Sequence, residues 1–298
     1  MRYLIIGYGI QGKKRHKILK KKCVGILDPY KNSANFKSLK TVDPKIFDNA
    51  VVSVPYNHQE KILKMLIKMK KNILIDKPII LKNKKSFTSL QKEIKKNKII
   101  IKTSYNHQYE KSIEKCIKLL KKKSIGDIYN LNMFYGNGTA KNIKSSNWKD
   151  TRNGVRNDLM PHLLMILISI LKKKKLKLVY KLDKKYENNS PDYSLLNLTC
   201  NNIVISLRAS YLSWKNSFKL EIYGSNGAVL IDGLCKWGSS KLTHLVRKFP
   251  SGKPYEKSYL FKDKDKSFLK EIEIFEKEIK KNKTSSISTD SWIFSLIN

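Results

Sequence analysis

The chain has 298 residues, 41% of them hydrophobic, which is enough to bury the cores of two domains. No apolar run reaches the ~18 residues that a membrane helix needs, and the N-terminus reads as a strand rather than as a signal peptide. We therefore expect a cytoplasmic protein that makes no membrane contact. The four cysteines form no C-x-x-C pair, which argues against a disulfide framework and against a structural metal site.

The net charge of +38 is high, but its distribution does not indicate a particular partner. Only six of the 62 basic residues are arginine, and the lysines occur in nearly every segment that predicts a helix. Nucleic-acid surfaces cluster their basic residues on one face and favour arginine for bidentate contacts. The charge therefore indicates solvated lysine faces and no specific nucleic-acid partner. A polyanion-binding structural protein stays open as an alternative.

The first twelve residues predict a dinucleotide-binding turn. Tyr3 to Ile6 form a short apolar run typical of a buried parallel strand. In the G-x-G-x-x-G that follows, the first glycine permits the tight bend, the second leaves room for a pyrophosphate, and the third lets the helix pack on the strand. A phosphate would lie on the N–H groups at the helix N-terminus. The candidate cofactor-binding residues of this turn are Gly7, Gly9, Ile10, Gln11 and Gly12.

The second predicted strand ends in Asp28, 16 residues after Gly12. An acidic residue near this offset accepts hydrogen bonds from the ribose hydroxyls of NAD, and it would repel the 2′-phosphate of NADP. Asp28 therefore favours NAD as the cofactor. A glycine-rich turn that binds no ligand is the structural alternative.

Residues 1–107 alternate short apolar runs with lysine-rich segments, and this rhythm predicts an N-terminal Rossmann domain with a doubly wound parallel sheet. Asn57 is a candidate N-cap, with Glu60 three residues later as in a capping box. The tetrapeptide YNHQ follows two of the predicted strands, at 56–59 and 105–108, at the sheet edge where open α/β sheets bind ligands. The predicted strands cover 2–7, 23–27, 50–55, 72–76 and 99–105, with a further small strand at 38–42, and the predicted helices cover 10–22, 58–70 and 84–96.

From about residue 125 the pattern changes to short strands separated by turn residues such as Asn201-Asn202. Residues 108–298 thus predict a C-terminal α+β domain with an open, mostly antiparallel sheet. An apolar sheet face needs a helix or a second subunit to cover it, so we expect a homodimer or a homotetramer. The predicted strands cover 128–136, 176–182, 193–200, 202–212, 217–224 and 228–233, and the predicted helices cover 158–171 and 267–281.

Two segments carry further candidate residues. Lys77 follows a predicted strand and precedes Pro78, which restricts it to an extended backbone at the carboxyl edge of the sheet. Asp158 is a candidate N-cap, Pro161 suits the first turn of a helix, and His162 lies four residues after Asp158. A capping aspartate and a buried core histidine remain the alternative to a catalytic pair.

Together these features resemble the Gfo/Idh/MocA family of NAD(P)-dependent oxidoreductases. The family's G-x-G-x-x-G matches Gly7 to Gly12, and its E-K-P matches Asp76-Lys77-Pro78 with a shorter acidic residue. Its proline and histidine after a strand resemble Pro55 and His58. The resemblance implies that Pro55, His58 and Lys77 contact the cofactor.

The second half of the chain carries the rest of the resemblance. The family's tyrosine–asparagine before the domain crossover matches Tyr105-Asn106, and its D-x-x-x-H matches Asp158 to His162. The family's late G-x-x-G matches Gly224 to Gly227. The resemblance implies a Rossmann domain followed by an open sheet that often buries one face in a dimer or tetramer. The implied substrate-binding residues are Tyr105, Asn106, Asp158 and His162.

The resemblance further implies hydride transfer between nicotinamide and a carbinol or keto carbon of a sugar, inositol or nucleotide-linked sugar. The implied catalytic residues are Lys77, Asp158 and His162. An imidazole, with its ordinary pKa of ~6.5, suits removal of the hydroxyl proton, so His162 is the candidate base. Lys77 would donate a hydrogen bond to the reacting oxygen, and Asp158 would orient the substrate or His162.

A non-catalytic dinucleotide-binding sensor on the same fold is the second hypothesis. Gln108, where the family often has arginine, and the single Gly154, where it has a run of glycines, favour this hypothesis. The presence of Lys77, Asp158 and His162 argues against it. Such a sensor would bind the cofactor and turn over no polyol.

Overall fold

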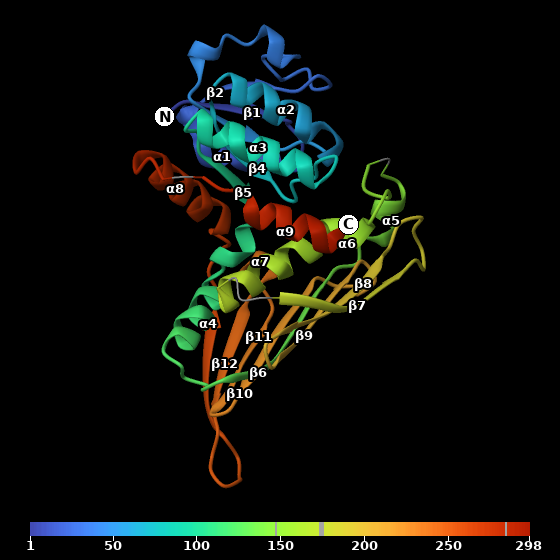
Figure 1. Ribbon diagram of the computed structural model, residues 1–298, viewed down its shortest axis with the longest axis vertical. Coiled ribbons are helices and arrows are strands. Elements are labelled where there is room, and N and C mark those ends of the chain that lie inside the picture. The colour runs from blue at the N-terminus through green and yellow to red at the C-terminus, as the bar shows by residue number, and fades with distance from the viewer. Residues whose placement is uncertain (147, 173–175, 284) are drawn as a thin grey trace. The chain divides into compact units, whose positions relative to one another are not determined.

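The computed structural model describes residues 1–146, 148–172, 176–283 and 285–298. The chain folds into two compact units, coloured along the chain in Figure 1. Unit 1 comprises Met1–Tyr105 and Phe268–Ser295, and unit 2 comprises Asn106–Ser267 and Leu296–Asn298. Residues 268–295, which the sequence pattern assigned to the second domain, therefore lie in unit 1.

Unit 1 is built on a five-stranded sheet in the order β2-β1-β3-β4-β5, with every pair of neighbouring strands parallel. This arrangement confirms the predicted parallel α/β fold. Strands buried on both faces need continuous apolar runs. Four of the five strands are mostly apolar, and the exception is residues 101–104, with the sequence IKTS. The strands are β1 (Tyr3–Ile6), β2 (Cys23–Leu27), β3 (Asn49–Val52), β4 (Asn72–Asp76) and β5 (Ile101–Ser104), and the helices are α1 (Ile10–Leu19), α2 (Tyr56–Lys68), α3 (Lys84–Lys96), α8 (Ser267–Lys280) and α9 (Ser288–Ile297).

Two apolar cores cover the two faces of this sheet. Leu4 of β1 belongs to one core together with Leu63 of α2, and residues of α3 complete it. The next residue, Ile5, points to the other face and belongs to the second core together with Phe275 of α8. The packing of α8 on the parallel sheet explains why this late segment belongs to unit 1.

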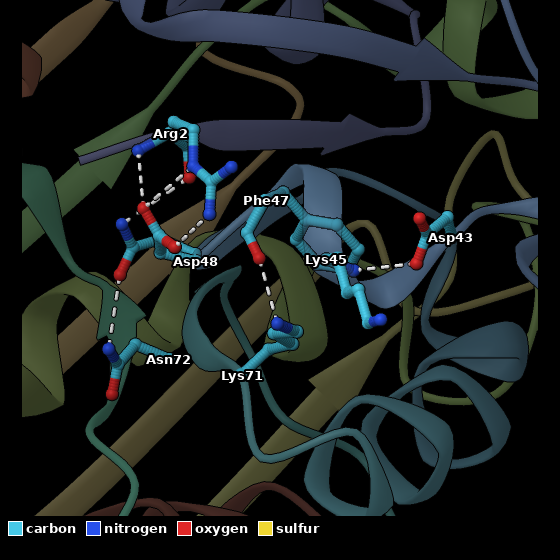
Figure 2. A network of polar contacts seen from close by, with 8 residues as sticks. Arg2, Asp43, Lys45, Phe47, Asp48, Lys71 and Asn72 are labelled. Carbon is cyan, nitrogen blue, oxygen red and sulfur yellow. Dashed lines mark hydrogen bonds and ion pairs between the residues drawn. The ribbon is translucent and has the colours of Figure 1, made fainter.

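Figure 2 shows polar contacts at the amino ends of the parallel strands. The guanidinium of Arg2, just before β1, lies 2.8 Å from the carboxylate of Asp48, just before β3. Asn72, at the start of β4, donates a side-chain hydrogen bond to Asn49 Oδ1 at 3.1 Å. The Arg2–Asp48 pair is exposed and contributes little to stability. The candidate residues Gly7 to Gly12, Asp28 and Lys77 follow the carboxyl ends of β1, β2 and β4, and so they lie at the opposite edge of this sheet.

Unit 2 contains an eight-stranded sheet in the order β13-β12-β11-β10-β6-β9-β8-β7, parallel only between β6 and β9 among the described residues. It confirms the predicted mostly antiparallel sheet; β12 and β13 were not predicted. The strands are β6 (Ile128–Gly136), β7 (Leu176–Lys184), β8 (Tyr193–Cys200), β9 (Ile203–Ser210), β10 (Ser217–Gly224), β11 (Gly227–Asp232), β12 (Ser240–Val246) and β13 (Tyr255–Phe261).

Helices cover one face of this sheet (Figure 1). Buried side chains such as Leu131 of β6 and Ile205 of β9 point toward this face. The helices are α4 (Lys111–Lys121), which contacts β11 and β12, α6 (Gly154–Asp158), which contacts β8 and β9, and α7 (Met160–Leu171), which contacts β6 and β9; the short α5 (Ala140–Lys144) lies between α4 and α6 in the chain. Within the described ranges, no helix combines the length and apolar character needed to cross a membrane.

The predicted capping box at the start of α2 is wrong. The helix begins at Tyr56, one residue before Asn57, and its N-cap is Pro55, whose side chain makes no cap hydrogen bond. The Glu60 carboxylate accepts the backbone N–H of Lys82 instead. The extended backbone of Pro55 sets the start of the helix, so Asn57 already lies within it.

The small strand predicted at 38–42 is also wrong. Leu39–Thr41 form a short 3-10 helix. Its apolar residues Leu39 and Val42 are both buried. Residues three apart share one side of a 3-10 turn, whereas alternate residues share one face of a strand. The three-residue spacing of Leu39 and Val42 is therefore typical of a 3-10 turn rather than of a strand.

Candidate functional site

The glycine turn lies between β1 and α1 in unit 1. A Cβ at Gly7, which has a φ of +90°, would lie 2.3 Å from the carbonyl oxygen of Ser53. A Cβ at Gly12 would lie 2.0 Å from the carbonyl oxygen of Gly7. The packing of the protein therefore requires both glycines. A Cβ at Gly9 would meet no atom within 4 Å, so this glycine leaves open space at the N-terminus of α1, where first-turn N–H groups favour an anion.

Asp28 follows β2 directly and is 8% exposed. One carboxylate oxygen accepts the backbone N–H of Tyr8 at 2.7 Å, and the other accepts the backbone N–H of Tyr30 at 2.9 Å. Asp28 therefore anchors the glycine turn. An ionised carboxylate offers about four lone-pair positions, so both oxygens can still accept further hydrogen bonds.

The Asp76-Lys77-Pro78 turn follows β4, and its Lys77–Pro78 peptide bond is cis. Lys77 is half-buried. Arg15 of α1 lies with Nη2 2.6 Å from Asp76 Oδ1, and Gln59 of α2 donates to the backbone carbonyl of Asp76 at 3.0 Å. Side chains from two helices thus hold the turn that carries Lys77.

A buried polar network continues behind this turn. Arg15 and Glu271 are each 1% exposed. Arg15 Nη2 donates to Ser104 Oγ at 2.6 Å, and Ser104 donates to Glu271 Oε2 at 2.5 Å. Burial raises the pKa of Glu271 to about 7, although the Arg15 guanidinium acts in the opposite direction. The network therefore joins α1, β4, β5 and α8 and contains a carboxyl group that titrates near neutrality.

Pro55 and His58, the other predicted cofactor residues, lie at the start of α2. Pro55 is its N-cap, and the side chain of His58 is exposed. The neighbouring Gln59 is 1% exposed and points inward. Cofactor contacts by Pro55 and His58 stay predictions.

The predicted substrate residues Tyr105 and Asn106 have protein partners within their own units. In unit 1, Tyr105 donates to Asp290 Oδ1 at 3.0 Å, and burial raises the pKa of Asp290 to about 6. In unit 2, Asn106 donates to Ser267 Oγ at 2.8 Å. Both are buried. These hydrogen bonds stabilise each unit locally, and substrate contacts by the two residues stay predictions.

An aromatic cluster surrounds His162 in unit 2. The His162 ring, near the start of α7, stacks on the His107 ring with centroids 4.1 Å apart. His107 Nε2 lies 3.2 Å from the hydroxyl of Tyr135, at the end of β6. Trp237 contacts Tyr135 with ring centroids 5.5 Å apart. His162 is 6% exposed, so its imidazole is held in one position by neighbouring rings.

Asp158 is not the N-cap of the helix that carries His162, so that prediction is wrong. It is the last residue of α6, and α7 begins at Met160 with Pro161 in its first turn, as predicted. The half-buried Asp158 accepts a hydrogen bond from the Tyr211 hydroxyl at 3.2 Å. The break at Leu159 separates the two helices, so helical spacing does not decide how Asp158 and His162 face one another.

Two buried side chains, Tyr135 of this cluster and the nearby Glu110, have raised pKa values. Burial raises the pKa of Tyr135, and the negative charges of Asp158 and Glu110 add to the effect. Burial, with a smaller contribution from Asp265, raises the pKa of Glu110 to about 7. At neutral pH the Tyr135 side chain is therefore a neutral phenol. The Glu110 carboxyl group is ionised in only a fraction of the molecules.

Several residues that hold or surround the candidate site residues were not predicted from the sequence, and two of them left a signal there. Gln59 is spaced four residues from Leu63 on the buried stripe of α2, which marks it as inward-facing. His107 lies in the second YNHQ, but the repeat did not distinguish it from its neighbours. The residues that were not predicted include Arg15, Gln59, Ser104, His107, Glu110, Tyr135, Tyr211, Trp237, Glu271 and Asp290.

The second half of the chain carries a recognisable family domain. Residues 113–230 match the family model described as the GFO/IDH/MocA C-terminal domain, so the predicted resemblance to the Gfo/Idh/MocA family is confirmed. A comparison with curated proteins found no match. In the part of the chain that the structure describes, no group of three or more His, Cys, Asp or Glu residues could hold a metal ion.

Solved structures of similar fold span the whole chain. Levoglucosan dehydrogenase in complex with NADH has a TM-score of 0.84 and 13% identity, covering 100% of this chain and 95% of that chain. UDP-N-acetylglucosamine 3-dehydrogenase GnnA from Acidithiobacillus ferrooxidans has a TM-score of 0.79 and 15% identity, with the same coverage. An oxidoreductase from Agrobacterium radiobacter, in complex with NAD+, L-tartaric acid and magnesium, has a TM-score of 0.81 and 14% identity over 100% of this chain and 94% of its own. At these identities the similarity establishes the fold.

Proposed function

We propose that this chain, whose residues 113–230 match the GFO/IDH/MocA C-terminal domain, is an NAD-dependent oxidoreductase. Its substrate would be a sugar, an inositol or a nucleotide-linked sugar, and the hydride would be transferred to or from a carbinol or keto carbon of that molecule. The observation that carries the proposal is the glycine turn, because the packing requires Gly7 and Gly12 whereas Gly9 leaves space at a helix N-terminus. Similar structures contain NADH or NAD+, which supports the same cofactor here.

The residues present fit a dinucleotide. The phosphates would lie against Gly7 to Gly12, and Asp28 would accept the ribose hydroxyls while it continues to anchor the turn. When bound, the nicotinamide would supply or accept the hydride. Pro55, His58 and Lys77 are the further cofactor contacts that we propose.

In this mechanism His162 takes the proton of the substrate hydroxyl during oxidation and returns it during reduction. Stacking on His107 keeps the imidazole in one orientation for this transfer. Lys77 donates a hydrogen bond to the reacting oxygen, where negative charge develops. Asp158, held by the Tyr211 hydroxyl, orients the substrate or His162.

A coupled assay tests the function. Mass spectrometry of the purified protein would identify a retained dinucleotide, and NADH absorbance would report turnover with sugars and nucleotide sugars. Levoglucosan and UDP-N-acetylglucosamine are the first substrates to test, because enzymes of similar fold are named for them. Cofactor binding without turnover of any polyol would support the sensor hypothesis instead. Binding of neither would contradict both.

The cofactor preference is a separate prediction. NAD should bind more tightly than NADP by about tenfold or more, because a 2′-phosphate would meet the Asp28 carboxylate in a partly desolvated site. Titration of protein fluorescence with each cofactor measures the two dissociation constants. Tighter binding of NADP would refute the assignment of Asp28 to the ribose. Lys31, exposed and three residues after Asp28, is the group that would weaken the preference.

The assembly of the chain is a further prediction. The face of the unit 2 sheet opposite the helices carries Phe134, Val204 and Tyr223, and Val204 is 60% exposed. Covering apolar surface gains ~25 cal/mol per Å², so we expect a homodimer or homotetramer that uses this face. Light scattering at micromolar concentration should show it, and Val204→Lys should dissociate it. A monomeric wild-type protein would contradict the prediction.

A further inference from the structure

One buried glutamine links the two ends of the turn that carries Lys77. Gln59 donates from Nε2 to the Asp76 carbonyl oxygen at 3.0 Å, and its Oε1 accepts the backbone N–H of Ile80 at 3.4 Å. A single planar amide thus joins the backbone that enters the turn to the backbone that leaves it. The acceptor and the donor that it meets also determine which amide atom is oxygen and which is nitrogen.

Arg15 holds the same turn by contacting the side chain of Asp76. Its Nη2 lies 2.6 Å from Asp76 Oδ1 and donates to Ser104 Oγ at 2.6 Å. Its guanidinium also lies over the Phe268 ring, with Cζ 4.8 Å from the ring centroid. Because Ser104 and Phe268 restrain the guanidinium from other directions, Arg15 offers Asp76 a partner of fixed position.

We propose that Gln59 and Arg15 are positioning residues for Lys77, an inference that rests on the proposed function in which Lys77 contacts the reacting oxygen. Gln59 sets the backbone path through the turn, and Arg15 sets the orientation of the residue before Lys77. A lysine has a flexible four-carbon stem, so a displaced backbone carries the ammonium group with it. A misplacement of ~1 Å in a catalytic site can lower the rate by about 10²-fold.

The chain offers a matched control for Gln59. Gln91 of α3 makes the same pair of hydrogen bonds elsewhere in unit 1: its Nε2 donates to the Ser285 carbonyl oxygen at 3.1 Å, and its Oε1 accepts the Ile287 N–H at 2.8 Å. Methionine has a similar length and shape but lacks the amide. Gln59→Met and Gln91→Met therefore remove the same chemistry from two different segments, and only the first releases the turn of Lys77.

Steady-state kinetics with NAD provide the first test. Both variants should lose comparable thermal stability. NAD affinity should change by only a few fold in Gln59→Met, because the proposed phosphate and ribose contacts stay in place and only the single contact from Lys77 is displaced, and it should not change in Gln91→Met. The kcat of Gln59→Met should fall by about tenfold or more with little change in KM, whereas Gln91→Met should match the wild type. Equal losses in the two variants, or no loss in either, would overturn the proposal. Arg15→Lys keeps the charge without the planar fork and should lower kcat in the same way, which preserves the test if Gln59→Met folds poorly.

A second readout does not depend on activity. Competitive labelling of amines, resolved by peptide mass spectrometry, gives the reactivity of Lys77 relative to the other lysines of the same sample. Gln59→Met should change the relative reactivity of Lys77 beyond the spread of those references, and Gln91→Met should leave it unchanged. If the wild type shows no turnover, the proposed function fails while the labelling still tests the positioning. Unchanged Lys77 reactivity in Gln59→Met would overturn the positioning role regardless of turnover.

Discussion

Replacing His162 with alanine is expected to lower turnover by a factor of about 10²–10⁴, the usual contribution of a positioned acid–base group. The loss follows if the imidazole, held against His107 at 4.1 Å, takes the proton of the substrate hydroxyl. Affinity for NAD should change little, because the proposed phosphate and ribose contacts belong to unit 1. The rise of the wild-type rate with pH, which reports the loss of a proton from the base, should disappear in His162→Ala.

Two variants serve as references for that measurement. His244→Ala removes another unit 2 histidine, one whose Nε2 lies 3.4 Å from the Ser124 carbonyl oxygen, and it should leave turnover nearly unchanged. Lys77→Ala should lose turnover through weaker stabilisation of the reacting oxygen, while the rise with pH survives at a lower rate. Near-normal turnover in His162→Ala, together with a lower melting temperature, would mean that His162 is a core residue. The base would then be sought at Lys77 or Asp158.

Arg15→Met is expected to destabilise the protein by about 3–5 kcal/mol, the usual cost of leaving buried charges without a partner. The variant keeps most of the side-chain volume but leaves the carboxylates of Asp76 and Glu271 without their nearest cation. Urea unfolding at fixed pH measures the change. Arg2→Met removes an exposed ion pair with Asp48 and should cost much less. Similar losses in the two variants would show that the buried network contributes no more than a surface pair.

The same network makes stability depend on pH in a defined direction. Burial raises the pKa of Glu271 from its ordinary 4.5 to about 7, so the folded state binds a proton there more tightly than the unfolded state does. The stabilisation from this proton is complete below about pH 4.5 and is lost as the pH rises through about 7. Glu271→Gln cannot ionise, so its stability relative to the wild type should rise across this window. Glu278→Gln, on the same helix with a less buried partner in Lys102, should show no such rise.

The sequence by itself determined the parallel sheet of unit 1 and the glycine turn. Strands that are buried on both faces must be apolar without interruption. A continuous apolar run such as residues 3–6 therefore predicts a buried strand from the local sequence alone. The requirement for glycine at Gly12 likewise arises from the turn itself, because a Cβ there would meet the carbonyl oxygen of Gly7. The alternation of apolar and polar residues predicted the sheet of unit 2 for the same local reason, since its two faces differ in burial.

Only the tertiary structure decided which side chains complete the site. Arg15, Asp76 and Glu271 come from segments far apart in the chain, and in a sequence so rich in lysine no charge pattern singles out one buried arginine. The apolar stripe of α8 would fit several surfaces, and its place on the parallel sheet follows from the packing of its Phe275 against residues such as Ile5 of β1 rather than from its own pattern. The contact between His107 and His162 also depends on how the 3-10 helix of residues Asn106–Tyr109, after β5, meets α7. A local sequence pattern predicts whether a residue is buried, but it does not predict which residue it contacts. That contact depends on the packing of segments that are far apart in the chain.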